Sequence, residues 1–340
     1  MELTRANSFP ASLTLNVAMS SNPIHDEGTE DLYPVSTVHS FPVNYFVENI
    51  AVRRSGQLLV TVHNRGELLQ IDPSSKSAPC LVHHFSTGIT GIVEVEEDVF
   101  YASVGEIGTK GSFTIYQVNM VHFAVDASHN VKTPATVSKL VDVPDALFLN
   151  GSALLSASRG IILVADSILA TVFSIDVGSR EVKVWLQDKA LGKVTDNPYY
   201  PGVNGIKVHK GALYLSNTDA KTFLRAGISA TGEATGSVEL VYDRCTADDF
   251  AFDSEGSVYL ATHVFQSVLK IRNNGVRTRI AGGPTDRVVA GTTAAAFGRT
   301  PLDGTTLYVT TNGGMSNPVD GEVGPARVLS IDVGRTGDIG

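Results

Sequence analysis

Hydrophobic and polar residues follow one short pattern that recurs six times along the chain. Each copy is a turn followed by a run rich in Val, Leu, Ile, Tyr and Thr, the residues that β-strands favour. The runs are QLLVTVH (57–63), DVFYASV (98–104), IILVADS (161–167), ALYLSNT (212–218), SVYLATH (257–263) and TLYVTTN (306–312). A repeat that returns every 41 to 63 residues, with helical periodicity hard to find, indicates stacked or radially arranged β-sheets.

Further strand-like segments flank most of these runs. Those that precede a run are 48–54, 91–97, 150–157, 204–210, 248–254 and, less clearly, 293–299. Those that follow a run are 67–73, 113–119, 171–177, 268–274, 327–333 and a weaker one at 222–229. Three or four antiparallel strands in each of six repeats predict an all-β fold, the six-bladed β-propeller.

The ends of the chain predict how the ring closes. The last blade ends near Val333 with little chain left for an outer strand, whereas the strand-like segment 32–41 precedes the first blade. We therefore expect this N-terminal strand to pair with the last blade. Residues 1–31 are expected to be a polar lead-in, 32–340 a single propeller domain, and 120–134 a long hairpin or insertion.

Composition and charge exclude several classes of protein. Hydrophobic residues make up 43% of the chain and charged residues 18%, which argues against global disorder. The chain has no run of 18 apolar residues, so we expect no membrane span. A net charge of −9 lacks the basic footprint of a nucleic-acid-binding protein. The N-terminus lacks the compact apolar core of a signal peptide, which favours a cytoplasmic protein, or a secreted one if a leader has been trimmed. We expect a monomer or weak dimer.

Candidate chemistry lies where the first strand of each blade begins at the central channel. Glu48, Asn150, Asn204 and Asp248 lie 8 to 11 residues before the repeated run of their blades. Two carboxylates and two amide oxygens suit a hard cation such as Ca²⁺. The alternative is that the Asn-Gly and Asp-Asp pairs at these positions simply make tight turns.

Four motifs carry a resemblance to a known family. VENIAV (47–52), LNGSAL (149–154), VNGIKV (203–208) and ADDFAFD (247–253) resemble the central-channel motifs of the senescence-marker-protein/gluconolactonase family of six-bladed propellers. The resemblance implies a divalent cation, usually calcium, on Glu48, Asn204 and Asp248, with Asn150 at the substrate. It also implies that Asp248 acts as general base for lactone hydrolysis, with no organic cofactor.

The sequence departs from that family in ways that change the expected substrate. Phe148 stands where the lactonases have a sugar-binding Arg, and Asp249 stands where they have Gly. Together with Phe250, Tyr199 and Tyr200, Phe148 predicts an apolar, aromatic mouth suited to a hydrophobic small molecule.

A narrower resemblance points to secondary metabolism. Segments 36–61, 203–208 and 247–263 are similar to a fungal branch of this superfamily in secondary-metabolite pathways. That branch includes hetero-Diels–Alderases, which join a tropolone quinone methide to a sesquiterpene alkene. The resemblance implies a similar cyclisation here.

Three functions remain open. The first is a pericyclic cyclase, with acid–base candidates Asp248, Asp249, His63 and His263 and hydrogen-bonding candidates Asn64, Asn217 and Asn312. His63 and His263 occupy the same place in their repeats, although either can be a surface or satisfied loop histidine, and Asn217 and Asn312 can be turn formers. The second is a calcium-dependent lactonase or esterase in which Asp248 activates water. The third is a non-enzymatic propeller that binds a small molecule.

Overall fold

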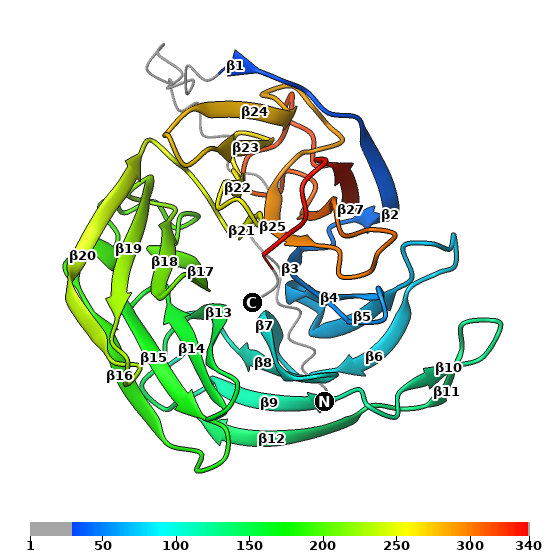
Figure 1. The fold of residues 1–340 in the computed structure, drawn as a ribbon. Helices are drawn as coiled ribbons and strands as arrows, with labels where there is room; N and C mark the ends of the chain where they lie inside the picture. The colour runs from blue at the N-terminus through cyan, green and yellow to red at the C-terminus, as the bar shows by residue number, and fades with distance from the viewer. Residues whose placement is uncertain (1–28, 339–340) are drawn as a thin grey trace, which may run out of the picture.

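The computed structural model describes residues 29–338, which form six antiparallel sheets arranged as blades around one axis (Figure 1). The strands of blade 1 are β3 (Val47–Val52), β4 (Leu58–Val62), β5 (Glu67–Ile71) and β6 (Cys80–His84). Those of blade 2 are β7 (Gly88–Glu96), β8 (Val99–Gly105), β9 (Thr114–Asn119) and β12 (Thr136–Asp142). Those of blade 3 are β13 (Leu149–Ser156), β14 (Ile161–Asp166), β15 (Thr171–Asp176) and β16 (Val182–Gln187).

The second half of the ring repeats the same order from the centre outward. Blade 4 comprises β17 (Val203–His209), β18 (Ala212–Asn217), β19 (Thr222–Ile228) and β20 (Ala234–Asp243). Blade 5 comprises β21 (Phe250–Phe252), β22 (Val258–Ala261), β23 (Ser267–Ile271) and β24 (Arg277–Gly282). Blade 6 comprises β25 (Thr292–Phe297), β26 (Thr306–Thr311), β27 (Pro325–Asp332) and β2 (Val35–Val43). The six repeated runs of the sequence coincide with the second strand of each blade, which confirms the predicted six-bladed propeller.

An N-terminal strand closes the ring, as predicted. Strand β2 pairs antiparallel with β27, from Val35 opposite Ile331 to Val43 opposite Pro325 (Figure 1). Upstream of it, β1 (Thr29–Glu30) adds to β24 in parallel, inside the segment expected to be a lead-in. The rest of that predicted lead-in, residues 1–28, lies outside the described residues.

Other elements are few. Strands β10 (Ala124–Val125) and β11 (Val131–Thr133) form the hairpin expected within residues 120–134. The helices in the described part of the chain are the single 3₁₀ turns η1 (His63–Arg65) and η2 (Lys189–Leu191), and neither is long enough to cross a membrane.

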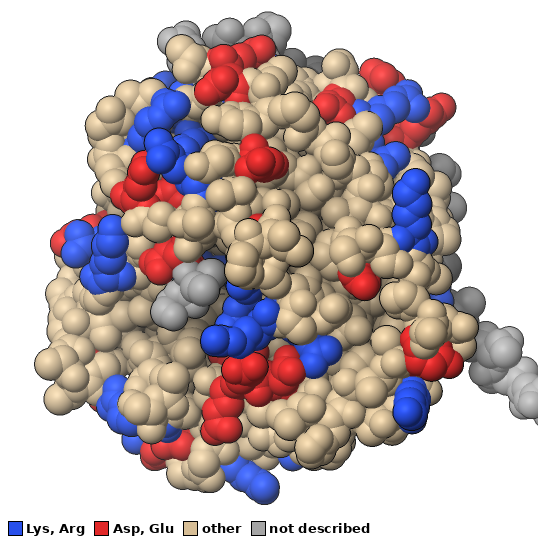
Figure 2. Space-filling model, turned by 45° about the vertical axis from the view of Figure 1, so that its right-hand side comes forward, with Lys and Arg blue, Asp and Glu red and all other residues tan. Residues whose placement is uncertain are grey.

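The hydrophobic core lies between neighbouring blades. Each of six apolar clusters draws its buried side chains mainly from two adjacent sheets; one joins Leu59 of blade 1 with Phe100 of blade 2, and another joins Val60 of blade 1 with Tyr308 of blade 6. Because each blade buries both faces in this way, the sequences of its inner strands are continuous apolar runs rather than alternating apolar and polar residues. Most charged side chains lie on the surface, where Figure 2 shows acidic and basic groups intermingled among uncharged ones.

The inner strands approach one another very closely at the axis. A Cβ at Gly91 would lie 2.0 Å from the backbone oxygen of Asn150, and one at Gly151 would lie 2.3 Å from that of Asn204. At Gly205, a Cβ would lie 2.3 Å from Oδ1 of Asp249. The Asn-Gly pairs thus lie inside strands β13 and β17, where glycine is needed for contact between blades and not for a tight turn.

The C-terminal segment ties three blades together at the opposite end of the inner strands. It runs toward the centre of the ring (Figure 1). The amide of Asp338 donates to the carbonyl of Phe252 (2.9 Å), and the Asp338 carboxylate lies 2.5 Å from Nδ1 of His209. The amide of Gly337 donates to the carbonyl of Gly304 (3.3 Å).

We predict that Gly151→Ala lowers the free energy of unfolding by at least about 1–3 kcal/mol, because the added methyl meets backbone atoms that cannot turn aside. Urea denaturation measures this loss. Gly178→Ala is the matched control, since a Cβ there would come no closer than 3.4 Å to the nearest atom. Equal stability of the two variants would contradict the close approach of blades 3 and 4.

Candidate active site on the propeller axis

One side chain from the start of each blade faces the axis. This first ring consists of Glu48, Thr90, Asn150, Asn204, Asp248 and Thr293, in blades 1 to 6. In five blades the strand register shifts at this position, as a β-bulge does, and such bulges re-aim a side chain out of the regular ladder. Four of the six members were predicted from the sequence. Thr90 and Thr293 were not, because they are ordinary β-strand residues by type and are revealed only by aligning the six strand starts.

A second ring lies at or just past the end of the second strand of each blade. Its members are His63, Gly105, Ser167, Thr218, His263 and Asn312. In blades 3, 4 and 5 the two rings touch within a blade: Asn150 Nδ2 to Ser167 Oγ (3.3 Å), Asn204 Nδ2 to Thr218 Oγ1 (3.0 Å) and Asp248 Oδ2 to His263 Nδ1 (2.7 Å). The pairing of Asp248 with His263 is therefore the blade 5 version of a repeated contact.

Most hydroxyl groups of the two rings hold the blades together. The hydroxyls of Ser167, Thr218, Thr90 and Thr293 each donate to a backbone carbonyl that precedes the first-ring residue of the next blade, over 2.6 to 2.8 Å. Since these hydroxyls are already engaged, they are poor candidates for chemistry on a ligand.

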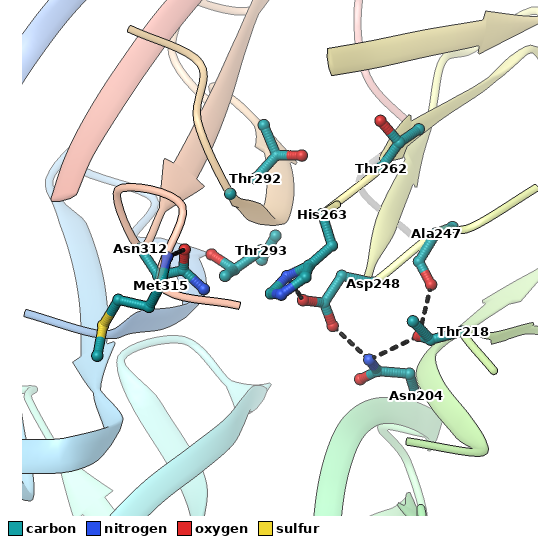
Figure 3. Close-up of polar contacts among 12 residues, drawn as sticks. Asn204, Thr218, Ala247, Asp248, Thr262, His263, Thr292, Thr293, Asn312 and Met315 are labelled. Atoms are coloured by element: carbon teal, nitrogen blue, oxygen red, sulfur yellow. Dashed lines mark hydrogen bonds and ion pairs between the residues drawn. The ribbon is translucent and has the colours of Figure 1, made fainter. Parts of the chain in front are cut away.

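Asp248 lies at the centre of a polar chain that crosses two blades (Figure 3). Its Oδ1 accepts a hydrogen bond from Asn204 Nδ2, and its Oδ2 faces Nδ1 of His263. The N–H direction of the His263 ring is not aligned with Oδ2, so the contact is an ion-pair approach rather than a straight hydrogen bond. Catalytic contacts are often misaligned in this way before substrate binds.

His263 has a strained backbone. Its φ is +31°, outside the regions that side-chain-bearing residues usually occupy, and its side chain is 7% exposed. Such strain costs roughly 1–3 kcal/mol and clusters at functional sites. No hydrogen bond or ion pair in residues 29–338 engages Nε2 of His263, which leaves that nitrogen available to a ligand.

Glu48 contributes an uncompensated carboxyl group to the axis. It is 8% exposed, and within the described part of the chain it has no hydrogen bond and no ion pair. Burial, followed by the nearby charges of Asp248 and Asp249, raises the pKa of the Glu48 carboxyl well above its usual range. At neutral pH this group either holds a proton or needs a positive partner.

The oxygen atoms of Glu48, Asp248 and Asn204 fit a hard cation, provided that the Asn204 amide oxygen is one of the ligands. Glu48 and Asp248 supply carboxylate oxygens, and Oδ1 of Asn204 has no hydrogen-bond partner among residues 29–338. No three His, Cys, Asp or Glu side chains of the described residues are grouped so as to hold an ion. A cation would therefore depend on the Asn204 amide oxygen, in keeping with the oxygen ligands that calcium accepts.

Two predicted site residues of blade 5 are engaged by other side chains of the protein. Both oxygens of Asp249 lie 2.7 Å from Nζ of Lys207, in a pair that joins blades 4 and 5. Burial raises the pKa of Asp249, while Lys207 acts in the opposite direction. Phe250 is fully buried and packs edge-on against Phe223, so it is a core residue and not part of the mouth.

The remaining histidine is packed inside the protein, and two predicted asparagines are bonded to the backbone. The ring of His63 lies against blade 2, where a Cβ at Gly88 would be 2.5 Å from its Cε1, and its Nδ1 has no hydrogen-bond partner in the described residues. Asn64 bonds the backbone of the preceding loop through both ends of its amide, and Asn217 donates to two backbone carbonyls and accepts from one amide. The turn-forming alternative considered for Asn217 describes its contacts.

The other three aromatic residues expected at the mouth differ in their exposure. Phe148 is half-buried and packs partly into the core between blades 2 and 3. Tyr199 is 65% exposed, and Tyr200 beside it is half-buried. Of these, Phe148 lies nearest to a ring residue in sequence, two positions before Asn150.

The chain is similar in sequence to two curated proteins, although no protein-family model matches it. A protein of Phoma sp. named "Putative hetero-Diels-Alderase" is 28% identical over 306 residues, which cover 82% of this chain and 87% of the relative. A protein of Sarocladium schorii with the same description is 25% identical over 329 residues, covering 87% of this chain and 82% of the relative.

Solved propellers share the fold at low sequence identity. A luciferin-regenerating enzyme has a TM-score of 0.67 at 14% identity and covers 91% of this chain and 98% of its own. Regucalcin of Agrobacterium tumefaciens, a calcium-binding protein, gives 0.63 at 13% identity over 91% and 96%. A protein described as a "putative gluconolactonase" gives 0.64 at 14% identity over 90% and 96%. These findings confirm both predicted resemblances.

We predict that His63 makes stability fall on acidification. Burial lowers the pKa of His63 below its ordinary value of 6.5, so below that pH the unfolded chain takes up a proton that the folded chain refuses. The stabilising effect of neutral His63 is complete above pH 6.5 and is lost as the pH falls toward the lowered pKa. The melting-temperature difference between wild type and His63→Gln should therefore shrink from pH 7.5 to pH 5.5.

His84→Gln, at an exposed position of β6, is the control and should show no such change. A difference for His63→Gln that stays constant across this pH range would contradict a neutral, buried His63.

Proposed function

We propose that this protein is a biosynthetic enzyme that catalyses a hetero-Diels–Alder cyclisation at the propeller axis. The observation that carries the proposal is the buried pair of His263 and Asp248, the one contact between the two rings that joins an imidazole to a carboxylate in the described residues. Its support from outside the structure is the similarity, over more than four fifths of the chain, to two proteins named as hetero-Diels–Alderases.

The first step is loss of water from a precursor that carries a hydroxymethyl group beside a ring hydroxyl. Nε2 of His263 donates a proton to the departing hydroxyl, the C–O bond breaks, and water leaves. The ring hydroxyl then returns its proton to Nε2, so the imidazole ends as it began and the ligand becomes a quinone methide. Asp248 orients the ring through Nδ1, as carboxylates do for catalytic histidines.

The second step joins the quinone methide to an alkene. One C–C and one C–O bond form as three π bonds are replaced, and no proton moves. The protein therefore acts by holding both partners in a reactive pose, which supplies up to roughly 7–11 kcal/mol in favourable cases. Exclusion of water protects the quinone methide from hydration. The fungal secondary-metabolism branch that the sequence resembles carries out chemistry of this class.

A calcium-dependent lactonase is the second candidate, and the unpartnered Glu48 carboxyl favours it. Glu48, Asn204 and Asp248 would hold the cation, which when bound supplies a Lewis acid for a carbonyl oxygen. In that case Asp248 accepts a proton from water, and Asn150 orients the substrate.

We predict that His263→Gln and Asp248→Asn each reduce cyclisation at least about 10²-fold, the lower bound for loss of a general acid–base group. The substrates are an ortho-hydroxymethyl tropolone and a sesquiterpene alkene, and the dihydropyran product is measured by mass spectrometry. His84→Gln is the matched control on the surface and should retain full activity. Formation of the adduct at the uncatalysed rate by the wild type would reject the proposal.

The lactonase candidate predicts that millimolar Ca²⁺ raises the melting temperature of the wild type and leaves that of Glu48→Gln unchanged. A ligand present at 100 times its dissociation constant stabilises the folded state by about 2.7 kcal/mol. Glu97→Gln, on an exposed turn, should respond to calcium as the wild type does. A wild type that is indifferent to calcium would remove the cation and the lactonase together.

A further inference from the structure

Some polar side chains in and beside the second ring have hydrogen-bond partners, and others do not. Ser167 and Thr218 donate to the backbone of the next blade, and the amide of Asn217 beside them is fully used by the backbone. Asn312 differs from all of these. Its side chain is completely buried, yet its Nδ2 has no hydrogen-bond partner in the described residues.

The orientation of the Asn312 amide is fixed by its other end. Oδ1 accepts hydrogen bonds from the backbone amides of Gly314 (3.0 Å) and Met315 (3.1 Å). A reversed amide would put an NH₂ group against two N–H donors, so the reversed form is excluded. Nδ2 must therefore point away from this turn, and in Figure 3 it points toward the imidazole of His263 and the side chain of Thr293.

The surroundings hold Asn312 in place. Gly291 packs so closely that a Cβ there would lie 1.9 Å from Oδ1 of Asn312. Gln266 binds this loop to its neighbours, since its Oε1 accepts from the Gly291 amide (2.5 Å) and its Nε2 donates to the carbonyl of Asn317 (2.8 Å). A side chain held this firmly cannot swing away to find a partner elsewhere.

A buried donor without an acceptor is unfavourable for the free protein, because the group has lost its hydrogen bonds to water. A ligand oxygen would restore that hydrogen bond. The neighbouring first-ring hydroxyl does not supply it: no hydrogen bond joins Thr293 to Nδ2 of Asn312, and Thr293 instead contacts the carbonyl of Val47 (2.6 Å) and the hydroxyl of Thr310 (2.8 Å).

We propose that Nδ2 of Asn312 binds the carbonyl oxygen of a conjugated ketone or quinone methide and so places that ligand beside His263. This rests on the proposed function only for the identity of the conjugated carbonyl. Because the amide is locked as a donor, the position recognises an acceptor oxygen and discriminates against a ligand of the same shape that lacks one. A hydrogen bond at this oxygen also draws electron density from the heterodiene, which favours reaction with an electron-rich alkene.

The test compares two probes of nearly identical shape, acetophenone and α-methylstyrene, in which a methylidene group replaces the carbonyl oxygen. Calorimetry measures both dissociation constants for the full-length wild type and for Asn312→Asp at pH 8. The aspartate retains the oxygen that accepts from Gly314 and Met315 and removes the donor. We expect Asn312→Asp to raise the dissociation constant of acetophenone, relative to that of α-methylstyrene, about tenfold over the wild-type ratio. That is the effect of one buried hydrogen bond.

A second variant at Asn312 repeats the test, and a variant elsewhere serves as the control. Asn312→Thr keeps an oxygen for the turn and puts a methyl group in place of the amide nitrogen, so it should behave like Asn312→Asp. Asn274→Asp makes the same change at an exposed turn, where Oδ1 likewise caps a backbone amide, and it should behave like the wild type. The infrared C=O stretch of bound acetophenone should lie lower in the wild type than in either Asn312 variant.

An unchanged ratio and an unshifted stretch would overturn the assignment, as would a wild type that binds no acetophenone. These outcomes are separable from failure of the proposed function. Adduct formation by the wild type with an unchanged ratio rejects only the role of Asn312, whereas a preserved ketone preference without adduct formation rejects only the cyclisation.

Discussion

The close approach of the innermost strands at the axis is the constraint on which the rest of the structure depends. Gly91, Gly151 and Gly205 leave no room for a Cβ because the next blade's inner strand passes within contact of them. The strand register shifts at the same place, which directs the preceding side chain toward the axis. Packing thus fixes the positions of the six first-ring side chains but not their residue types. The chemistry at the axis can therefore vary while the backbone of the propeller stays the same.

Hydrogen bonding divides that axis into two sides. On the side of blades 3 and 4, every described ring side chain has a partner, either within its blade or on the backbone of the next. On the side of blades 5, 6 and 1, four ring side chains keep a polar atom without a hydrogen bond, namely His63, His263, Asn312 and Glu48. Since buried polar groups are normally satisfied, this is the side on which the proposed ligand would find unused hydrogen-bonding groups.

The sequence predicted the frame better than the site. Strand order and ring closure could be predicted because each blade repeats the same apolar run, and four ring positions because Glu, Asn and Asp stand out among strand residues. Thr90 and Thr293 could not be identified by type, since threonine is common in any strand. The roles of Asn64, Asn217 and Asn312 were inseparable, because only the structure distinguishes an amide that the backbone uses from one that it leaves free. Phe250 failed as a mouth residue because it is fully buried against Phe223 in the core between blades 4 and 5, and an aromatic residue near the axis has the same sequence signal in either place.

The two candidate chemistries compete for the same atoms. Oδ2 of Asp248 faces His263, and Oδ1 accepts from Asn204, so a cation bound by Asp248 and Asn204 would have to displace one of these contacts. A cation would also supply the positive charge that Glu48 lacks, whereas without one the raised pKa favours a protonated Glu48. The charge state of Glu48 and the partner of Asp248 are therefore linked: a bound cation would favour ionised Glu48 and draw Asp248 away from His263. Without a cation, the raised pKa favours the protonated form of Glu48, and His263 keeps the carboxylate that orients it for proton transfer.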